Sequence, residues 1–347
     1  MRIGIYTHYA HCDEAYLCLR LADFLRGQDV ECSIYSDSSP SKLGVSFDNS
    51  VLHKQKCRYT DWAKQQTAII WTHPPPLATL NYAKRQGVRT LIVPMWQELE
   101  RPFRKVMQSA DHVVALTTEC RELFTVVYKL KNVTLIPFDA GLPIIKKAKP
   151  VTDHGISVFL PWFDRNAKCS NSEFLGLLRY LLERMTDISL TVAISSCRFS
   201  PAIAKFFSRL SVKTGGRIKL VRNVAVLRRP ALYTAHDLTI YPAECDNYGL
   251  CGLTSINCGT PVLSFNLSPQ ADFLYPDSNG VLVKTKIDYD ENGVPHASAD
   301  YELFLTTLQN LVAEPRQIDN LNKRVNYNLT ARKKSFVLGW QTLLRLV

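Results

Sequence analysis

Residues 235–265, AHDLTIYPAECDNYGLCGLTSINCGTPVLSF, decide the fold together with residues 266–283, NLSPQADFLYPDSNGVLV. The pattern is a short apolar strand from Leu238 to Tyr241, an acidic loop, a helix of small residues and a second apolar strand from Val262 to Phe265. This order predicts a βαβ crossover. Ligands of open α/β sheets bind at the carboxyl ends of strands and at helix N-termini, so we expect the loop from Ala243 to Gly249 to bind an anion.

The same stretch resembles the donor-binding signature of the family-four, GT-B-type retaining glycosyltransferases. That signature reads approximately P-S-x-x-E-x-F-G-L-x-x-x-E-A-x-A-x-G-x-P-V, followed by a short loop and N-G-x-L-V. The matching residues, in order, are Pro242, Asp246, Tyr248, Gly249, Leu250, Gly259, Pro261, Val262, Asn279, Gly280, Leu282 and Val283. The resemblance covers most of residues 155–347 and reaches the first half only by its pattern.

The resemblance implies an α/β protein of the GT-B class, with two Rossmann-like, doubly wound domains that face each other across a cleft. Alternating strands and helices in both halves of the chain, among them the helices expected over residues 81–86, 172–184 and 201–213, agree with this expectation. The segment from Asp139 to Gly155 loses this periodicity and gains turn residues, so it is the expected linker. We expect an acceptor-binding domain over residues 1–145 and a donor-binding domain over residues 155–318. The C-terminal helices, residues 319–347, are then expected to cross back to the first domain, with Ser335 to Val347 packing there.

Composition favours a protein with a large core and excludes several classes. The chain has 347 residues, 46% of them hydrophobic, which fits two globular domains. The N-terminus lacks the pattern of a signal peptide, and no run of 18 apolar residues predicts a membrane helix. Ten cysteines without a Cys-x-x-Cys pair indicate buried free thiols. We therefore expect a cytoplasmic protein, or one in the host cytoplasm if it is virus-encoded.

The positive charge of the chain, +11 at pH 7, points to an anionic partner. Between residues 42 and 105 there are eleven Lys and Arg against four Asp and Glu. Three interpretations stay open: a nucleic-acid acceptor, an anionic membrane or lipid-linked acceptor, and an ordinary solvated surface. On the first interpretation, the candidate acceptor-binding residues are Lys54, Lys56 and Arg58.

The resemblance assigns donor-binding roles within the signature. Asp246 takes the position of the first acid of the family's E-x7-E motif, near the donor sugar, although an Asp here is also a good helix N-cap. Thr254 stands where the family has the second Glu, which grips the ribose, so Glu244 is a candidate to replace it. The other candidates are Asn247, Tyr248, Gly249 and Leu250.

Two further segments carry candidate donor contacts. The family places an Arg and a Lys in the loop after the first strand of the second domain, to stabilise the charge of the leaving diphosphate. Here Lys168 falls at the Lys position, Trp162 stands at the Arg position and Arg165 is a candidate substitute; both cations could equally be solvated. Asn223 and Val224 belong to a segment that resembles the one bracketing the nucleotide base.

On the acceptor side, His73 lies in a Trp-Thr-His-Pro-Pro-Pro turn that resembles an apolar-His-x-His-x-Pro turn of the family. It is a candidate catalytic or sugar contact, or a structural His beside a rigid proline run. Trp96 and Glu98 follow the next strand: Trp96 could stack on a sugar or belong to the core, and Glu98 could accept the acceptor proton. His11 is a further candidate acceptor contact. No cofactor or metal is expected, because no second cluster with ligand spacing accompanies His11.

These observations together predict a retaining glycosyltransferase that moves a sugar from a nucleotide-sugar to an acceptor hydroxyl. The expected acceptor is a hydroxymethylated base in DNA, as for virus-encoded DNA-modifying glycosyltransferases. One alternative is an envelope saccharide or a lipid-linked acceptor. Another is a degenerate GT-B protein that binds nucleotide or DNA without turnover, which the replacements at Trp162, Trp96 and Thr254 suggest.

Overall fold

The chain folds into two compact units. The computed structural model describes residues 1–7, 12–36, 51–53, 57–96, 99, 102–142, 155–162, 172–194, 201–222, 224 and 229–346. The first unit contains Met1–Asp139, Asp290–Val294 and Arg332–Val347, and the second contains Ala140–Tyr289 and Pro295–Ala331. The chain thus passes from the first unit to the second within the segment predicted as a linker.

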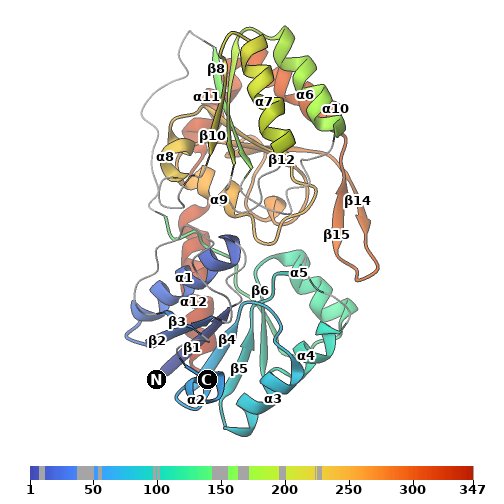
Figure 1. The fold of residues 1–347 in the computed structure, drawn as a ribbon. Helices are drawn as coiled ribbons and strands as arrows, with labels where there is room; N and C mark the ends of the chain where they lie inside the picture. Colours follow the sequence, from blue (N-terminus) through green and yellow to red (C-terminus); the bar gives the residue numbers. More distant parts are fainter. Residues whose placement is uncertain are drawn as a thin grey trace. The chain divides into compact units, whose positions relative to one another are not determined.

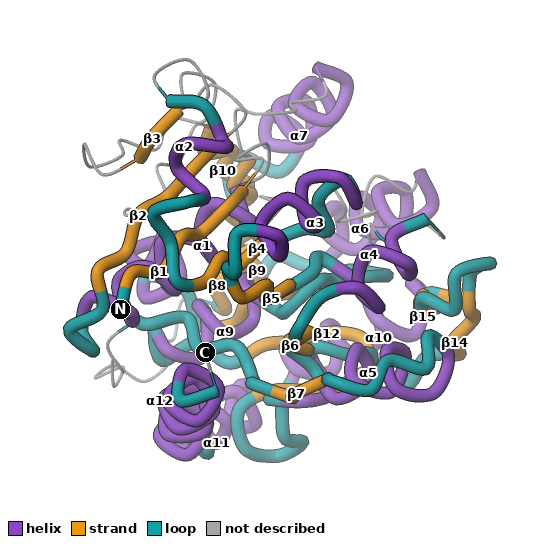
Figure 2. Tube along the Cα trace, turned by 90° about the horizontal axis from the view of Figure 1, so that it is seen from below, coloured by secondary structure: helices purple, strands orange, loops and turns teal. Residues whose placement is uncertain are grey.

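A parallel sheet of seven strands, in the order β3-β2-β1-β4-β5-β6-β7, forms the first unit (Figures 1 and 2). Its strands are β1 Arg2–Thr7, β2 Glu31–Ser36, β3 Val51–His53, β4 Ala68–Trp71, β5 Arg89–Ile92, β6 His112–Ala115 and β7 Val133–Leu135. Its helices are α1 Cys12–Arg26, α2 Tyr59–Ala63, α3 Leu77–Arg85, α4 Phe103–Ser109 and α5 Thr118–Glu122, which continues as the π-helix Leu123–Val127. Such a sheet needs helices on its faces, because parallel strands are buried on both sides.

Aromatic residues pack closely against β1 and β2. Gly4 lies under Trp62, where a Cβ on Gly4 would come within 2.4 Å of the indole ring. Tyr6 and Tyr35 stack with ring centroids 5.6 Å apart, and Tyr59 meets both rings edge-on. This part of the sheet therefore accepts no larger residue than glycine beneath the indole of Trp62.

The second unit contains a parallel sheet of six strands in the order β10-β9-β8-β11-β12-β13. Its strands are β8 Ile156–Trp162, β9 Ile188–Ile194, β10 Ile218–Arg222, β11 Leu238–Tyr241, β12 Val262–Phe265 and β13 Gly280–Val283. Its helices are α6 Ser172–Arg184, α7 Pro201–Lys213, α8 Arg229–Thr234, α9 Leu250–Asn257, α10 Tyr301–Ala313 and α11 Pro315–Arg324. An antiparallel hairpin, β14 Lys286–Tyr289 and β15 Pro295–Ser298, precedes α10.

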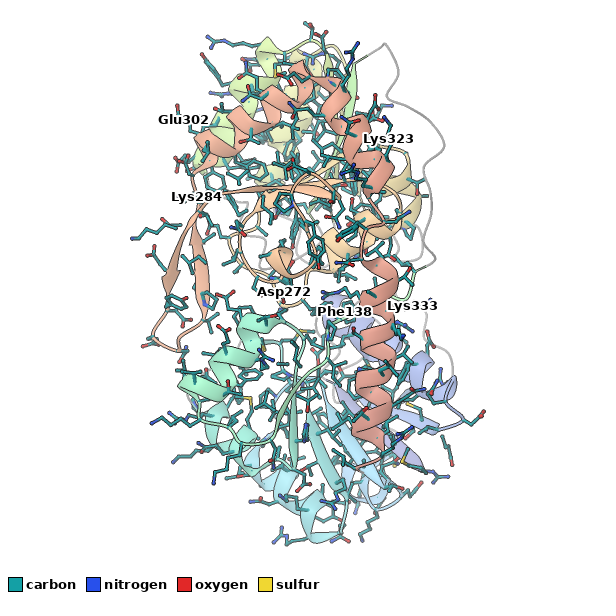
Figure 3. The ribbon with its side chains drawn as sticks, turned by 180° about the vertical axis from the view of Figure 1, so that it is seen from behind. Phe138, Asp272, Lys284, Glu302, Lys323 and Lys333 are labelled. Atoms are coloured by element: carbon teal, nitrogen blue, oxygen red, sulfur yellow. The ribbon has the colours of Figure 1, made fainter. Side chains whose placement is uncertain are left out.

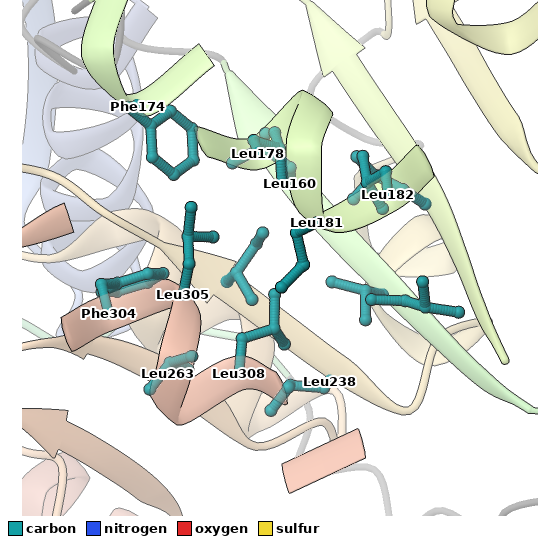
Figure 4. Close-up of a cluster of buried hydrophobic side chains, with 14 of the residues drawn as sticks. Leu160, Phe174, Leu178, Leu181, Leu182, Leu238, Leu263, Phe304, Leu305 and Leu308 are labelled. Carbon is teal, nitrogen blue, oxygen red and sulfur yellow. The ribbon is translucent and has the colours of Figure 1, made fainter. Parts of the chain in front are cut away.

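Helices α6 and α10 cover the same region of this sheet with leucine and phenylalanine side chains. Phe174 and Leu178 of α6 lie with Leu305 and Leu308 of α10 over Leu160 and other strand residues (Figure 4). Each of these side chains is nearly or fully buried. In each helix the apolar residues are spaced three and four positions apart, so they form one face that packs into this core.

The last helix, α12 Leu329–Leu344, belongs to the first unit from Arg332 onward. Phe336 meets Phe24 of α1 edge-on at 5.3 Å, and the guanidinium of Arg332 donates to the carbonyl of Phe138 at 2.8 Å. Gly339 passes so close to Ile136 that a Cβ there would lie 3.1 Å from its side chain. Residues Arg332–Val347 thus belong to the first unit, whereas residues 319–331, which were also expected to cross back, belong to the second.

The hairpin turn Asp290–Val294 is also part of the first unit, which the sequence did not suggest. Val294 is fully buried in the core of that unit. The hydroxyl of Tyr128 donates to the carbonyl of Asn292 at 3.3 Å. This turn and α12 are therefore two excursions of the C-terminal part of the chain into the first unit.

Several element bounds differ from the sequence-based expectations. The helix expected from Asn81 to Gln86 begins earlier, at Leu77, directly after Pro76 at its N-cap. A proline run suits this start, because the first helical turn leaves its N–H groups without intrahelical acceptors. The hairpin β14–β15 was not predicted, since each of its strands has only four residues and neither is apolar throughout.

We predict that Leu308→Ala destabilises the second unit by about 2–5 kcal/mol, because the side chain is fully buried and its removal leaves a cavity. The free energy of unfolding from urea denaturation measures this change. Leu303→Ala is the matched control on the same helix, since Leu303 is 41% exposed and its truncation should cost less than about 0.5 kcal/mol. Equal losses for both variants would contradict this packing of α10.

Candidate functional site

The loop between β11 and α9, residues 242–249, lies at the carboxyl edge of the second sheet. Gly249 caps α9 with φ +76° and ψ +30°, a left-handed conformation that favours glycine. A Cβ on Gly249 would lie 2.4 Å from the ring of Phe273. Both the backbone conformation and the close approach therefore require glycine at the start of α9.

Asp246 holds this loop with its carboxylate, which is 3% exposed. Its Oδ1 accepts from the backbone N–H groups of Tyr248 at 3.3 Å and Gly249 at 3.1 Å. Its Oδ2 accepts from Nε2 of Gln270 at 2.9 Å. Asp246 is therefore not the N-cap of α9, a position that Gly249 occupies; its carboxylate holds the two residues that precede the helix.

Gln270 and Ser268 are site residues that the sequence reasoning missed. Gln270 is 1% exposed and bonds Asp246 from the loop that follows β12. Within the described chain, Gln270 Oε1 and Ser268 Oγ are buried and have no hydrogen-bond partner. Because buried polar groups are normally paired, these two atoms mark unused hydrogen-bonding capacity in the loop that follows β12. No motif signalled Gln270, since its contact with Asp246 is made by the fold.

Glu244 connects the loop to the elements that follow the hairpin. Its Oε1 accepts from the hydroxyl of Tyr301 at 2.5 Å, and its carbonyl accepts from the N–H of Ala297 at 2.8 Å. The side chain is partly buried. Its hydrogen bond to Tyr301 fixes one oxygen of the carboxylate.

The remaining donor candidates divide by burial. Tyr248 and Leu250 are 1% and 5% exposed, so their side chains pack in the core and do not present a surface to a ligand. The N–H of Tyr248 is taken by Asp246, whereas that of Leu250, at the start of α9, has no acceptor within the helix. Asn247 and Thr254 are also buried, at 5% and 6% exposure.

Other predicted donor residues lie elsewhere. Val224 is partly buried beyond β10. Trp162, at the position of the family Arg, is 8% exposed and packs edge-on against Phe207 at 6.0 Å, so it belongs to the core. The predictions for Arg165, Lys168 and Asn223 fall outside the described residues.

In the first unit, a buried carboxylate lies where β1 and β4 end side by side. Glu14 of α1 is 3% exposed and its Oε1 accepts from the hydroxyls of Thr7 at 2.7 Å and Thr72 at 2.5 Å. The same oxygen lies 3.3 Å from Nδ1 of His73, which is 15% exposed. His73 was predicted as a site residue, but its partner Glu14 was not.

The ionisation of Glu14 follows from these contacts. Burial alone raises the pKa of its carboxyl group, but the hydrogen bond and positive charge of His73, with the two threonine hydroxyls, lower the pKa to about 2. Glu14 therefore carries a negative charge at neutral pH. A carboxylate on Nδ1 of an imidazole fixes the orientation of the ring and favours a proton on that nitrogen.

The other acceptor-side predictions have different outcomes. Trp96 is 1% exposed and lies in the hydrophobic core of the first unit, so the alternative of core packing is correct and stacking on a sugar is not. Arg58 is exposed and stands at the N-cap of α2. The predictions for His11, Lys54, Lys56 and Glu98 fall outside the described residues.

Comparison with solved structures identifies the architecture. The sucrose-phosphate synthase of Thermosynechococcus elongatus matches with a TM-score of 0.72 and 14% identity, over 100% of this chain and 98% of that one. The pneumococcal O-GlcNAc transferase GtfA, in complex with UDP and GlcNAc, matches with a TM-score of 0.75 and 9% identity, over 99% and 98%. The Anabaena protein HepE, in complex with UDP and glucose, matches with a TM-score of 0.71 and 12% identity, over 100% and 99%.

This chain has the GT-B fold. No protein-family model matches the sequence, and no curated protein matches it significantly. At sequence identities of 9–14%, the matches to solved structures show that the fold is shared. The expected fold class, an α/β protein with two Rossmann-like domains, is confirmed.

No helix in the described part of the chain is both long and apolar enough to cross a membrane. No group of three or more His, Cys, Asp or Glu side chains within the same residues could hold a metal ion. The independence of this GT-B protein from a metal remains a prediction.

We predict that Gly249→Ala destabilises the second unit by more than backbone strain alone. An alanine in the left-handed backbone conformation lowers the free energy of unfolding by roughly 1–2 kcal/mol. At position 249 its Cβ must also displace the ring of Phe273. Gly216→Ala is the matched control, because Gly216 has φ +83° in the same unit and a Cβ there meets nothing within 4 Å. Urea denaturation should show a larger loss for Gly249→Ala; an equal loss would place Phe273 elsewhere.

We also predict a pH-dependent effect of Glu14→Gln. The lowered pKa of Glu14 stabilises the fold above the ordinary value of 4.5, and this contribution is lost as the pH falls toward about 2. The difference in melting temperature between wild type and variant should be large at pH 7 and shrink steadily below pH 4.5. Glu31→Gln, on the exposed surface, is the control. A difference that stays constant between pH 7 and pH 3 would refute the assigned ionisation.

Proposed function

We propose that this protein is a glycosyltransferase that moves a sugar from a nucleotide-sugar donor to an acceptor hydroxyl, with retention of configuration. The observation that carries the proposal is the loop of residues 242–249 with the start of α9, at the carboxyl edge of a GT-B sheet. Two of the matching GT-B structures hold UDP with a sugar. The ordered signature between Pro242 and Val283 supports the same assignment.

The proposed reaction requires the second unit to stabilise the negative charge of the leaving diphosphate. The bond between the sugar C1 and the diphosphate oxygen breaks, the bond between C1 and the acceptor oxygen forms, and the acceptor proton passes to the diphosphate. N–H groups without intrahelical acceptors at the start of α9 suit that negative charge. Lys168 and Arg165 are the proposed cations, and no protein nucleophile is required.

The roles of the two carboxylates follow from their contacts. We assign Asp246 a positioning role, because it holds the N–H groups of Tyr248 and Gly249 and the amide of Gln270. On the acceptor side, His73 is the proposed contact, with Glu14 fixing its ring. Glu98 remains the candidate for orienting the acceptor hydroxyl.

For the acceptor, we propose a hydroxymethylated base in DNA. The support is the net charge of +11, which suits a polyanionic acceptor. The donor's sugar and base are left to experiment.

The test incubates the protein with a panel of nucleotide-sugars and either plain DNA or DNA containing 5-hydroxymethylcytosine or 5-hydroxymethyluracil. Mass spectrometry of the digested nucleosides should show a sugar increment on the modified base only. Release of nucleotide from one donor without any DNA product would keep the transferase and move the acceptor to an envelope saccharide or a lipid-linked one. No release from any donor would leave a binding protein without turnover and refute the proposal.

A further inference from the structure

Helices α6 and α7 lie side by side on the second unit (Figure 1). Side chains of both helices line a hollow of about 350 Å³. Its lining includes Arg179 of α6 and, from α7, Lys205, Phe206, Arg209, Leu210 and Lys213. None of the lining residues is acidic. The hollow belongs to helices that cover the sheet and is distinct from the loop of residues 242–249.

The cations of this hollow form a row. Lys205, Arg209 and Lys213 follow each other at four-residue spacing, so they share one face of α7 over about 12 Å. Arg179 faces them from α6. We call these four residues the cation row. Like charges at this spacing destabilise a helix by about 0.2–0.5 kcal/mol per pair, so folding alone does not favour the arrangement.

The row is only partly neutralised. Lys213 forms an ion pair with Glu183 of α6 at 3.2 Å. Elsewhere in the described chain, no carboxylate lies within ion-pair distance of Arg179, Lys205 or Arg209. All four side chains of the row are exposed. The fold thus places three cations, Arg179, Lys205 and Arg209, on one surface without a carboxylate to neutralise them.

Apolar and aromatic groups lie between and beside these charges. Phe206 and Leu210 form the apolar part of the lining. Tyr180 is 56% exposed on α6, with the guanidinium of Arg184 over its ring at 3.5 Å. A basic groove with aromatic groups is the combination by which proteins bind single-stranded nucleic acid.

We propose that the cation row binds the phosphates of a nucleic-acid strand. A linear row of long, exposed side chains along α7, faced by Arg179 of α6, suits a linear series of phosphates. A single small phosphate is usually held by backbone N–H groups at a helix N-terminus or in a nest, whereas these cations extend along α7 to its last residue, Lys213. The inference deepens the proposed function and rests on DNA being the acceptor.

The experiment measures binding of a fluorescent oligothymidylate by anisotropy, without donor, at several salt concentrations. The test variant is Lys205→Ala with Arg209→Ala. The control variant, Lys284→Ala with Lys323→Ala, removes the same charge from exposed positions of the second unit outside the hollow (Figure 3). Melting temperatures confirm that both variants fold.

The test variant should bind roughly tenfold more weakly at low salt, and its log–log salt slope should fall in magnitude by about 1.4, for two lost phosphate contacts. The control should match wild type within about twofold. Binding should also strengthen with oligomer length from a mononucleotide upward. Equal behaviour of both variants, or a mononucleotide that binds as well as an oligomer, would overturn the inference.

Anionic phosphatidylglycerol vesicles provide the competing outcome. Flotation that depends on Lys205 and Arg209, without matching DNA binding, would assign the row to a membrane surface and overturn the nucleic-acid site. Nucleotide release from the donor alone is measured on the same variants and should be unchanged. Unchanged DNA binding of the test variant with intact donor release would overturn this inference alone, whereas the absence of donor release from the wild-type protein would refute the glycosyltransferase assignment.

Discussion

The arrangement of the second unit's site depends on one buried carboxylate. Asp246 bonds two successive N–H groups ahead of α9 and the amide of Gln270 in the loop after β12. It therefore joins the ends of two neighbouring strands and leaves the N–H groups of the first turn of α9 for another acceptor. Replacing it with an apolar residue would leave buried donors without partners, at a cost of about 1–3 kcal/mol for each.

The first unit has a comparable buried carboxylate in Glu14, but its contacts serve a different purpose. Glu14 gathers two hydroxyls and an imidazole at the ends of β1 and β4, and so orients a ring that is still partly exposed. The first carboxylate shapes a backbone loop, whereas the second orients a side chain. Such a division suits a protein in which one unit holds an anionic donor and the other contributes side-chain chemistry.

Local patterns predicted much of the fold. The helices Ser172–Arg184 and Pro201–Lys213 have the predicted bounds, because their apolar faces are regular. The sequence predicted the crossover from Leu238 to Phe265 equally well, because both strands are short, apolar and bounded by turn residues.

Contacts between distant segments could not be predicted in this way. Glu14 and His73 meet only because β1 and β4 are neighbours in the sheet. Gln270 reaches Asp246 because the loop after β12 folds over the start of α9. The spacing of Lys205, Arg209 and Lys213 is visible in the sequence, but the facing position of Arg179 is a property of the packed helices.

Hydrogen–deuterium exchange with and without a nucleotide-sugar tests the central claim most directly. If the loop of residues 242–249 and the start of α9 form the donor site, the donor should slow amide exchange in peptides that span residues 242–257. Gly249→Ala should weaken that protection, and Gly216→Ala should not. Tight donor binding that leaves these peptides unprotected would contradict the account and place the donor elsewhere in the protein.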